Sequence, residues 1–145
     1  MLKKKTQLII IIIFLNFANS LFASENFFKD AIKKYNEKKF EDAKFLFQRN
    51  IVFNPKDTKS YLYLAKIYNN EENQKEELKN INTVILLDPK NEEAVYMLIK
   101  IDLKKSNYLE VKKLLKTFLV ICNNLCEKEK SVLEALTNIE PKNES

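Results

Sequence analysis

Apolar residues recur every three or four positions from Phe27 onward, and short polar stretches separate the runs. This spacing places them along one side of an α-helix and predicts a series of amphipathic helices. The first pair of runs, divided by a polar turn at Lys38 and Lys39, contains Phe27, Phe28, Ala31, Ile32 and Tyr35, then Phe40, Ala43, Phe47 and Ile51.

The pattern repeats with a fixed period, because Pro55 and Pro89 lie 34 residues apart and the stretches that end at them align. Three units follow in register, 24–57, 58–91 and 92–125. A period of this length is typical of stacked helical arrays, in which one helix pair cannot bury its apolar face alone. The alternative is an irregular helical bundle with a chance period.

The composition favours the same fold class. The chain has 145 residues, 46% hydrophobic and 31% charged, with no glycine, histidine or tryptophan. A chain without glycine has difficulty building hairpins and phosphate-binding loops, which need positive φ angles. Arg49 is the only arginine, so the bidentate donor that favours nucleic acids is nearly absent. An all-α protein that does not bind nucleic acid is expected.

The repeat unit resembles the tetratricopeptide repeat (TPR), a 34-residue helix–turn–helix unit. The first unit matches best, and the third departs most, with Ile99, Val111 and Asn123 in place of a small residue, alanine and proline. The matching positions of the first unit are Phe27, Ala31, Phe40, Ala43, Phe47 and Pro55. The resemblance implies an all-α, TPR-type helical solenoid of three helix–turn–helix repeats plus a C-terminal capping helix at 126–140, within a domain at 24–140.

The same resemblance implies that the first helix of each unit lines a groove for a protein segment. By position, the side chains facing it are Glu25, Phe28, Lys29, Ile32 and Tyr35; then Lys59, Leu62, Tyr63, Lys66 and Asn69; then Glu93, Tyr96, Met97, Lys100 and Leu103. The alternative at each position is that the side chain packs in the core. A clamp for a partner's C-terminal carboxylate is not expected, because Phe28, Ile32, Tyr63, Glu93 and Met97 replace its donors.

Positions expected in the core are Phe27, Ala31, Ala43, Phe47, Ala65 and Ile81. Helix starts are expected at Asp57 or Thr58, Asn91 and Ser106, where a short polar side chain can accept a backbone N–H. Asn73 and Glu76 have the spacing of a capping box.

The chain begins with a predicted leader at 1–23. Three lysines precede a short apolar run, and small residues follow it, which is the layout of a secretory signal peptide. An uncleaved membrane anchor is the alternative, although the run from Leu8 to Ala23 is shorter than the ~20 residues of a span. Both readings place the repeats outside the cytoplasm of a bacterium, in the periplasm or outside the cell. At the other end, residues 141–145 are expected to fray.

Cys122 and Cys126 are four residues apart. Helical spacing and an exported location favour a disulfide between them, and two free thiols are the alternative. No metal site is expected, since two cysteines without histidine supply too few ligands.

No catalytic constellation stands out. Histidine is absent, and the acidic pairs Glu71–Glu72, Glu76–Glu77 and Glu92–Glu93 are interpreted as solvated helix faces or first turns. The sequence therefore predicts a non-enzymatic adaptor of the bacterial cell envelope that needs no cofactor and binds another protein. The alternatives are a self-associating structural subunit and an accessory subunit of an envelope enzyme or assembly machine.

Overall fold

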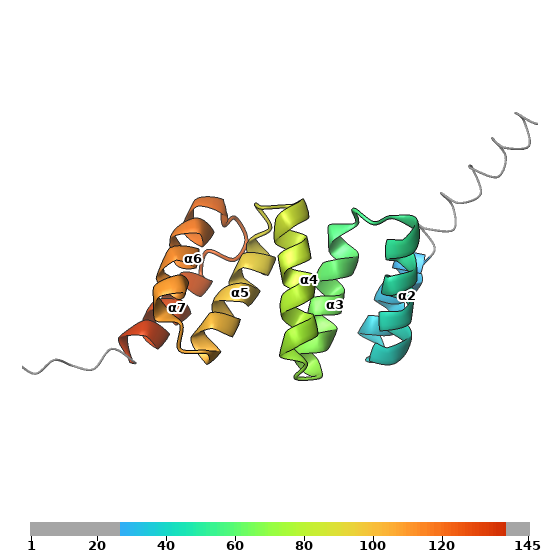
Figure 1. Ribbon diagram of the computed structural model, residues 1–145, viewed down its shortest axis with the longest axis horizontal. Helices are drawn as coiled ribbons and strands as arrows, with labels where there is room; N and C mark the ends of the chain where they lie inside the picture. The colour runs from blue at the N-terminus through green and yellow to red at the C-terminus, as the bar shows by residue number, and fades with distance from the viewer. Residues whose placement is uncertain (1–26, 139–145) are drawn as a thin grey trace, which may run out of the picture. The chain divides into compact units, whose positions relative to one another are not determined.

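The computed structural model describes residues 27–138, and all regular structure in that range is α-helical, which confirms the predicted fold class (Figure 1). The predicted leader and the predicted frayed tail lie outside the described residues. A first helical segment covers 27–36. It is followed by α2 (Phe40–Phe53), α3 (Thr58–Asn70), α4 (Gln74–Leu87), α5 (Glu92–Lys104), α6 (Tyr108–Ile121) and α7 (Lys128–Thr137). None of the helices within 27–138 is long and apolar enough to cross a membrane.

The backbone divides within α3 into two compact units, the first ending at Ile67 and the second beginning at Tyr68. Of the residues predicted to form the core, only Phe27 is half-buried; its ring stacks on Phe53 at 5.6 Å. The fully buried ones, as predicted, are Ala31, Ala43, Phe47, Ala65 and Ile81. The amphipathic pattern thus identified the residues that the helices bury against one another.

In the second unit, α5, α6 and α7 build one hydrophobic core cluster. Its buried members are Val95, Ile99, Val111, Leu115, Phe118, Val132 and Leu136. Ile85 of α4 and Leu103 of α5 pack against it. The side chains come from facing stripes of successive helices, so each helix covers the apolar face of the one before.

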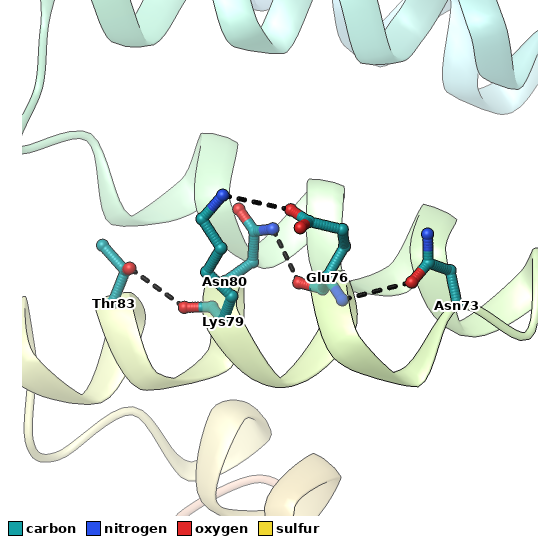
Figure 2. Close-up of polar contacts among 5 residues, drawn as sticks. All are labelled: Asn73, Glu76, Lys79, Asn80 and Thr83. Carbon is teal, nitrogen blue, oxygen red and sulfur yellow. Dashed lines mark hydrogen bonds and ion pairs between the residues drawn. The ribbon is translucent and has the colours of Figure 1, made fainter.

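The start of α4 has one half of the predicted capping box: Asn73 caps the helix, whereas the Glu76 carboxylate pairs with Lys79 and not with the Asn73 N–H (Figure 2). The side-chain oxygen of Asn73 accepts a hydrogen bond of 3.3 Å from the backbone N–H of Glu76. One turn on, Lys79 forms an ion pair of 3.2 Å with the Glu76 carboxylate. Asn80 and Thr83 donate to the backbone carbonyls of Glu76 and Lys79, respectively, at 2.8 and 3.0 Å. The Asn73 bond satisfies one free N–H group of the helix end, and the bond to the Glu76 carbonyl gives the buried Asn80 amide, 7% exposed, a partner.

Other helix starts use the same chemistry. Asn91 accepts a hydrogen bond of 3.0 Å from the N–H of Ala94 and caps α5 as predicted. Before α3, the Asp57 carboxylate accepts hydrogen bonds of 2.7 Å from Ser60 and from Asn50. Asn50 and Ser60 are buried, and the hydrogen bonds that they form with Asp57 connect the end of α2 to the start of α3 within the first unit.

Within residues 27–138, the positive φ angles lie in the turns between the two helices of each repeat. Lys38, Glu72 and Ser106 have φ of 59°, 56° and 56°, and they are spaced by the repeat period. The prediction that Ser106 caps α6 is wrong: it adopts this left-handed conformation, and Asn107 occupies the N-cap position without a side-chain hydrogen bond to the helix. Thus non-glycine residues adopt the left-handed conformation that glycine usually supplies.

Cys122 and Cys126 are joined by a disulfide with a Cα–Cα distance of 5.2 Å. Cys122 directly follows α6, and Cys126 lies two residues before the start of α7. The bridge therefore closes the connection between α6 and α7, as the cysteine spacing predicted.

Candidate functional site

Within the first unit, Tyr63 of α3 is the centre of an aromatic cluster on the first-helix side. Its ring centroid lies 4.9 Å from that of Tyr35, 5.2 Å from Phe47 and 6.4 Å from Phe28. Phe47 is fully buried, whereas Phe28, Tyr35 and Tyr63 are half-buried. The three half-buried rings therefore pack against the core and keep part of their surface accessible.

A half-buried lysine contacts this cluster. The ammonium of Lys66 lies 4.8 Å from the centre of the Tyr63 ring, a cation–π distance. Lys59 is exposed and Ile32 is half-buried, so both can reach a partner. Leu62 is only 8% exposed, and its side chain belongs mainly to the core.

In the second unit, the first-helix residues divide between packing and surface. Tyr96 is half-buried and its ring lies 5.9 Å from that of Phe118, against the core cluster. Lys100 is exposed on the same helix. Asn69 is half-buried and donates a hydrogen bond of 2.8 Å to the carboxylate of Glu77.

Glu77 corrects one interpretation of the sequence. Glu77, expected on a solvated helix face or in a first turn, does lie in the first turn of α4 but is only 4% exposed. Burial raises the pKa of its carboxyl, and the Asn69 hydrogen bond and the positive charges of Lys104 and Lys100 oppose that rise. It lines a recess of about 250 Å³ with Asn69, Glu72, Gln74 and Lys104. We call this the Glu77 recess.

Glu92, in the first turn of α5, has a role that the sequence did not indicate. Its carboxylate accepts hydrogen bonds from the backbone N–H groups of Asn123, Asn124 and Leu125 at distances of 2.6 to 3.2 Å. The Asn123 N–H is the main cause of the lowered pKa of Glu92. The helix start thereby fixes the α6–α7 connection that carries the disulfide. Because the partners are 31 or more residues apart, no local pattern could reveal it.

The described residues offer no metal site, since no group of three or more Asp, Glu, Cys or His side chains within 27–138 could hold an ion. The clustered chemistry in this range is aromatic and basic. It suits the recognition of a protein segment, in which aromatic anchors supply area and lysines supply charge selectivity.

This arrangement of helix pairs with a fixed period defines a TPR-type fold. The TPR domain of Sgt2 from Aspergillus fumigatus superposes with a TM-score of 0.67 at 12% identity, covering 80% of each chain. The type III secretion translocator chaperone SycD of Yersinia enterocolitica gives a TM-score of 0.68 at 20% identity, over 84% of this chain and 95% of that one.

SycD has also been solved with a peptide of the translocator YopD, and that structure gives a TM-score of 0.64 at 18% identity, over 78% of this chain and 86% of the other. No protein-family model matches the sequence, and no curated protein matches it. The likeness to solved structures confirms the TPR-type fold that the repeat pattern predicted.

Proposed function

We propose that this protein is a non-enzymatic interaction module, an adaptor that binds a segment of another protein through first-helix side chains. The observation that carries the proposal is the pairing of Lys66 with the Tyr63 ring in the first unit. A cation held over an aromatic face is placed to meet an acidic group, and the ring beneath gives an apolar contact. In the second unit, Lys100 and Tyr96 supply the same two chemistries from α5.

The partner segment has apolar side chains and acidic residues in alternation. Half-buried rings such as Phe28 and Tyr35 are held by their neighbours, so they lose little conformational entropy when a partner covers them. The exposed lysines at Lys59 and Lys100 add charge selectivity and speed association with an acidic segment.

The structural neighbours support binding of a protein segment, because one of them, SycD, has been solved with a peptide of YopD. They support a binding role over a catalytic one as well. The fold alone carries many functions, so the charge and the aromatic rings of this chain must decide its partner.

The proposed location is the bacterial cell envelope, after export. The basic, apolar and small-residue layout of residues 1–23 supports export, and so does the disulfide between Cys122 and Cys126. The mass of the protein recovered from envelope fractions tests this point. A mature chain that begins near Ser24 is expected, and recovery of the chain in the cytoplasm would contradict it.

The function itself is tested by crosslinking in envelope fractions with the protein as bait. One dominant partner crosslinked through Lys66 or Lys100 is expected. Lys66→Glu and Lys100→Glu should each weaken that partner about tenfold, whereas Lys75→Glu, an exposed lysine on the second helix α4, should not. Equal binding by all three variants would overturn the proposal that Lys66 and Lys100 select an acidic partner. Self-crosslinks alone, with a size that grows with concentration, would instead indicate a self-associating subunit.

A further inference from the structure

A groove of about 440 Å³ runs between α6 and α7 in the second unit, apart from the proposed first-helix surface. Leu115 and Leu136, 7% and 6% exposed, lie at its floor. Leu119 and Leu133, 42% and 43% exposed, lie nearer the solvent. The groove therefore combines a closed apolar floor with apolar edges that remain open.

The repeat itself shows what covers such a groove. One period earlier, Leu119 and Leu133 correspond to Ile85 of α4 and Ile99 of α5. Ile99 is fully buried and Ile85 is half-buried, because both pack in the cluster to which α6 contributes. The covering stripe of α6 is Val111, Leu115 and Phe118, at positions i, i+4 and i+7 of a helix. An amphipathic helix is thus the shape that fits this face.

The charges around the groove give the covering helix a direction. Lys112 and Lys116 lie on the α6 wall, and Glu129 lies in the first turn of α7. The connection 122–127 joins the end of α6 to the start of α7, so Glu129 lies at the connection end of the groove, Lys116 lies more than one turn before the end of α6, and Lys112 lies one turn further from it. Lys116 and Glu129 have no side-chain ion pair within the described part of the chain. A bound helix with acidic residues at the lysine end complements this arrangement.

We propose that the α6–α7 groove binds an amphipathic helix of a partner protein, with apolar residues at i, i+4 and i+7 and acidic residues toward Lys112 and Lys116. This is a second binding surface, on helices that carry none of the lysines tested for the first. Its occupant takes the place that α6 takes on the preceding helices. The bound helix buries Leu119 and Leu133 and pairs its acidic end with Lys116.

The test uses a fluorescent helical peptide of about 15 residues, long enough to hold a helix on a surface, with leucines at i, i+4 and i+7 and glutamates at one end. Anisotropy against the full chain should show saturable binding. Leu119→Asp and Leu133→Asp should each weaken it about tenfold or more. Val120→Asp is the matched control, because Val120 is 85% exposed and adjacent to Leu119 but does not line the groove. Circular dichroism checks that each variant is folded.

Charge reversal provides the second arm. Lys116→Glu should weaken the glutamate peptide and strengthen a matching lysine peptide, whereas Lys130→Glu, exposed on α7 outside the groove, should change neither. Absence of peptide binding, or equal losses in Leu119→Asp and Val120→Asp, would overturn the proposal. Two other occupants of the groove would also overturn the proposal. A second copy of the chain would be shown by a concentration-dependent dimer that Leu119→Asp abolishes. The chain's own end would be shown by much tighter peptide binding after removal of residues 139–145.

Discussion

The side-chain amide of Asn69 donates a hydrogen bond of 2.8 Å to the carboxylate of Glu77, which is only 4% exposed. The corresponding residues of the first repeat are Tyr35 and Ala43, and those of the third are Leu103 and Val111. Ala43 and Val111 are fully buried. The second repeat therefore places one polar pair where its neighbours use apolar packing, and the amide donor partly compensates for the buried carboxylate.

Glu77→Gln should stabilise the protein at neutral pH by about 1 kcal/mol, because it removes a buried charge and keeps an acceptor for Asn69. Burial raises the pKa of Glu77 above its usual 4.5. The contribution of Glu77 to stability is therefore complete below pH 4.5 and is lost as the pH rises through the raised pKa. Urea denaturation of the wild type and of Glu77→Gln across this pH range should show that the stability of the variant relative to the wild type increases as the pH rises.

Glu76→Gln is the matched control for this comparison, since Glu76 precedes Glu77 but forms its ion pair with Lys79 at the surface. Its free energy of unfolding should change little. A Glu77→Gln variant that is less stable than the wild type at neutral pH would show that the carboxylate charge is needed, through Lys100 and Lys104, for the fold.

Glu92→Gln should have the opposite pH dependence. Hydrogen bonds from Asn123, Leu125 and Asn124 lower the pKa of Glu92 below 4.5. Its stabilisation is present above that value and is lost as the pH falls through the lowered pKa. The variant should be less stable by about 1–2 kcal/mol at neutral pH, because charged acceptors form the stronger hydrogen bonds. The difference should disappear in acid.

Equilibrium unfolding from neutral to acid pH measures this loss, and hydrogen exchange at Asn123 and Leu125 locates it. Glu134→Gln, an exposed glutamate of α7, should leave both observables unchanged. Slow exchange of those two amides in Glu92→Ala, which has no side-chain acceptor, would contradict the assignment of Glu92 as their acceptor.

Replacing both Cys122 and Cys126 by serine should lower the free energy of unfolding by about 2 kcal/mol, the value that loop closure predicts for so short a ring. The effect should be less than additive with Glu92→Gln, because the disulfide and the Glu92 hydrogen bonds fix the same connection. Urea denaturation of Glu92→Gln, of the double serine variant and of the combination of both measures the coupling. Strict additivity would show that the two constraints act independently.

The helices could be predicted from the sequence because the pattern of residues that specifies them is local and periodic. The spacing of Pro55 and Pro89 and the apolar stripe predicted the TPR-type fold and buried residues such as Phe47. Glu77 was misjudged because a charged residue next to Glu76 in a helical pattern normally faces water, and only the folded chain shows the Asn69 amide beside it. The role of Glu92 depends on residues more than thirty positions away. The first-helix surface remains a prediction, since a half-buried ring such as Tyr63 satisfies both packing and binding.

Phe47→Ala should destabilise the first unit by about 3–5 kcal/mol, because Phe47 is fully buried and contacts Phe28 and Tyr63. Phe45 on the same helix is 60% exposed and provides a matched control. Phe45→Ala should change the free energy of unfolding by no more than about 0.5 kcal/mol. Similar losses in the two variants, measured by chemical denaturation, would show that Phe47 does not anchor this core.

Ser106→Gly should stabilise the protein by up to about 1 kcal/mol. Ser106 has φ of 56°, where a side-chain β-carbon crowds the backbone and glycine does not. The gain is reduced by the larger entropy of glycine in the unfolded chain, so it remains a fraction of the strain that is relieved. Ser106 is exposed, and no described hydrogen bond uses its hydroxyl, so removal of the side chain costs little packing.

Two serine variants check that φ is the cause. Ser106→Ala should give no gain, because alanine is as unfavourable as serine at positive φ. Ser131→Gly, in the interior of α7, should destabilise the protein by about 1 kcal/mol, since the backbone there is helical. Thermal and urea unfolding of the three variants against the wild type make the comparison. A gain in Ser106→Ala equal to that in Ser106→Gly would assign the effect to the lost hydroxyl instead of to backbone conformation.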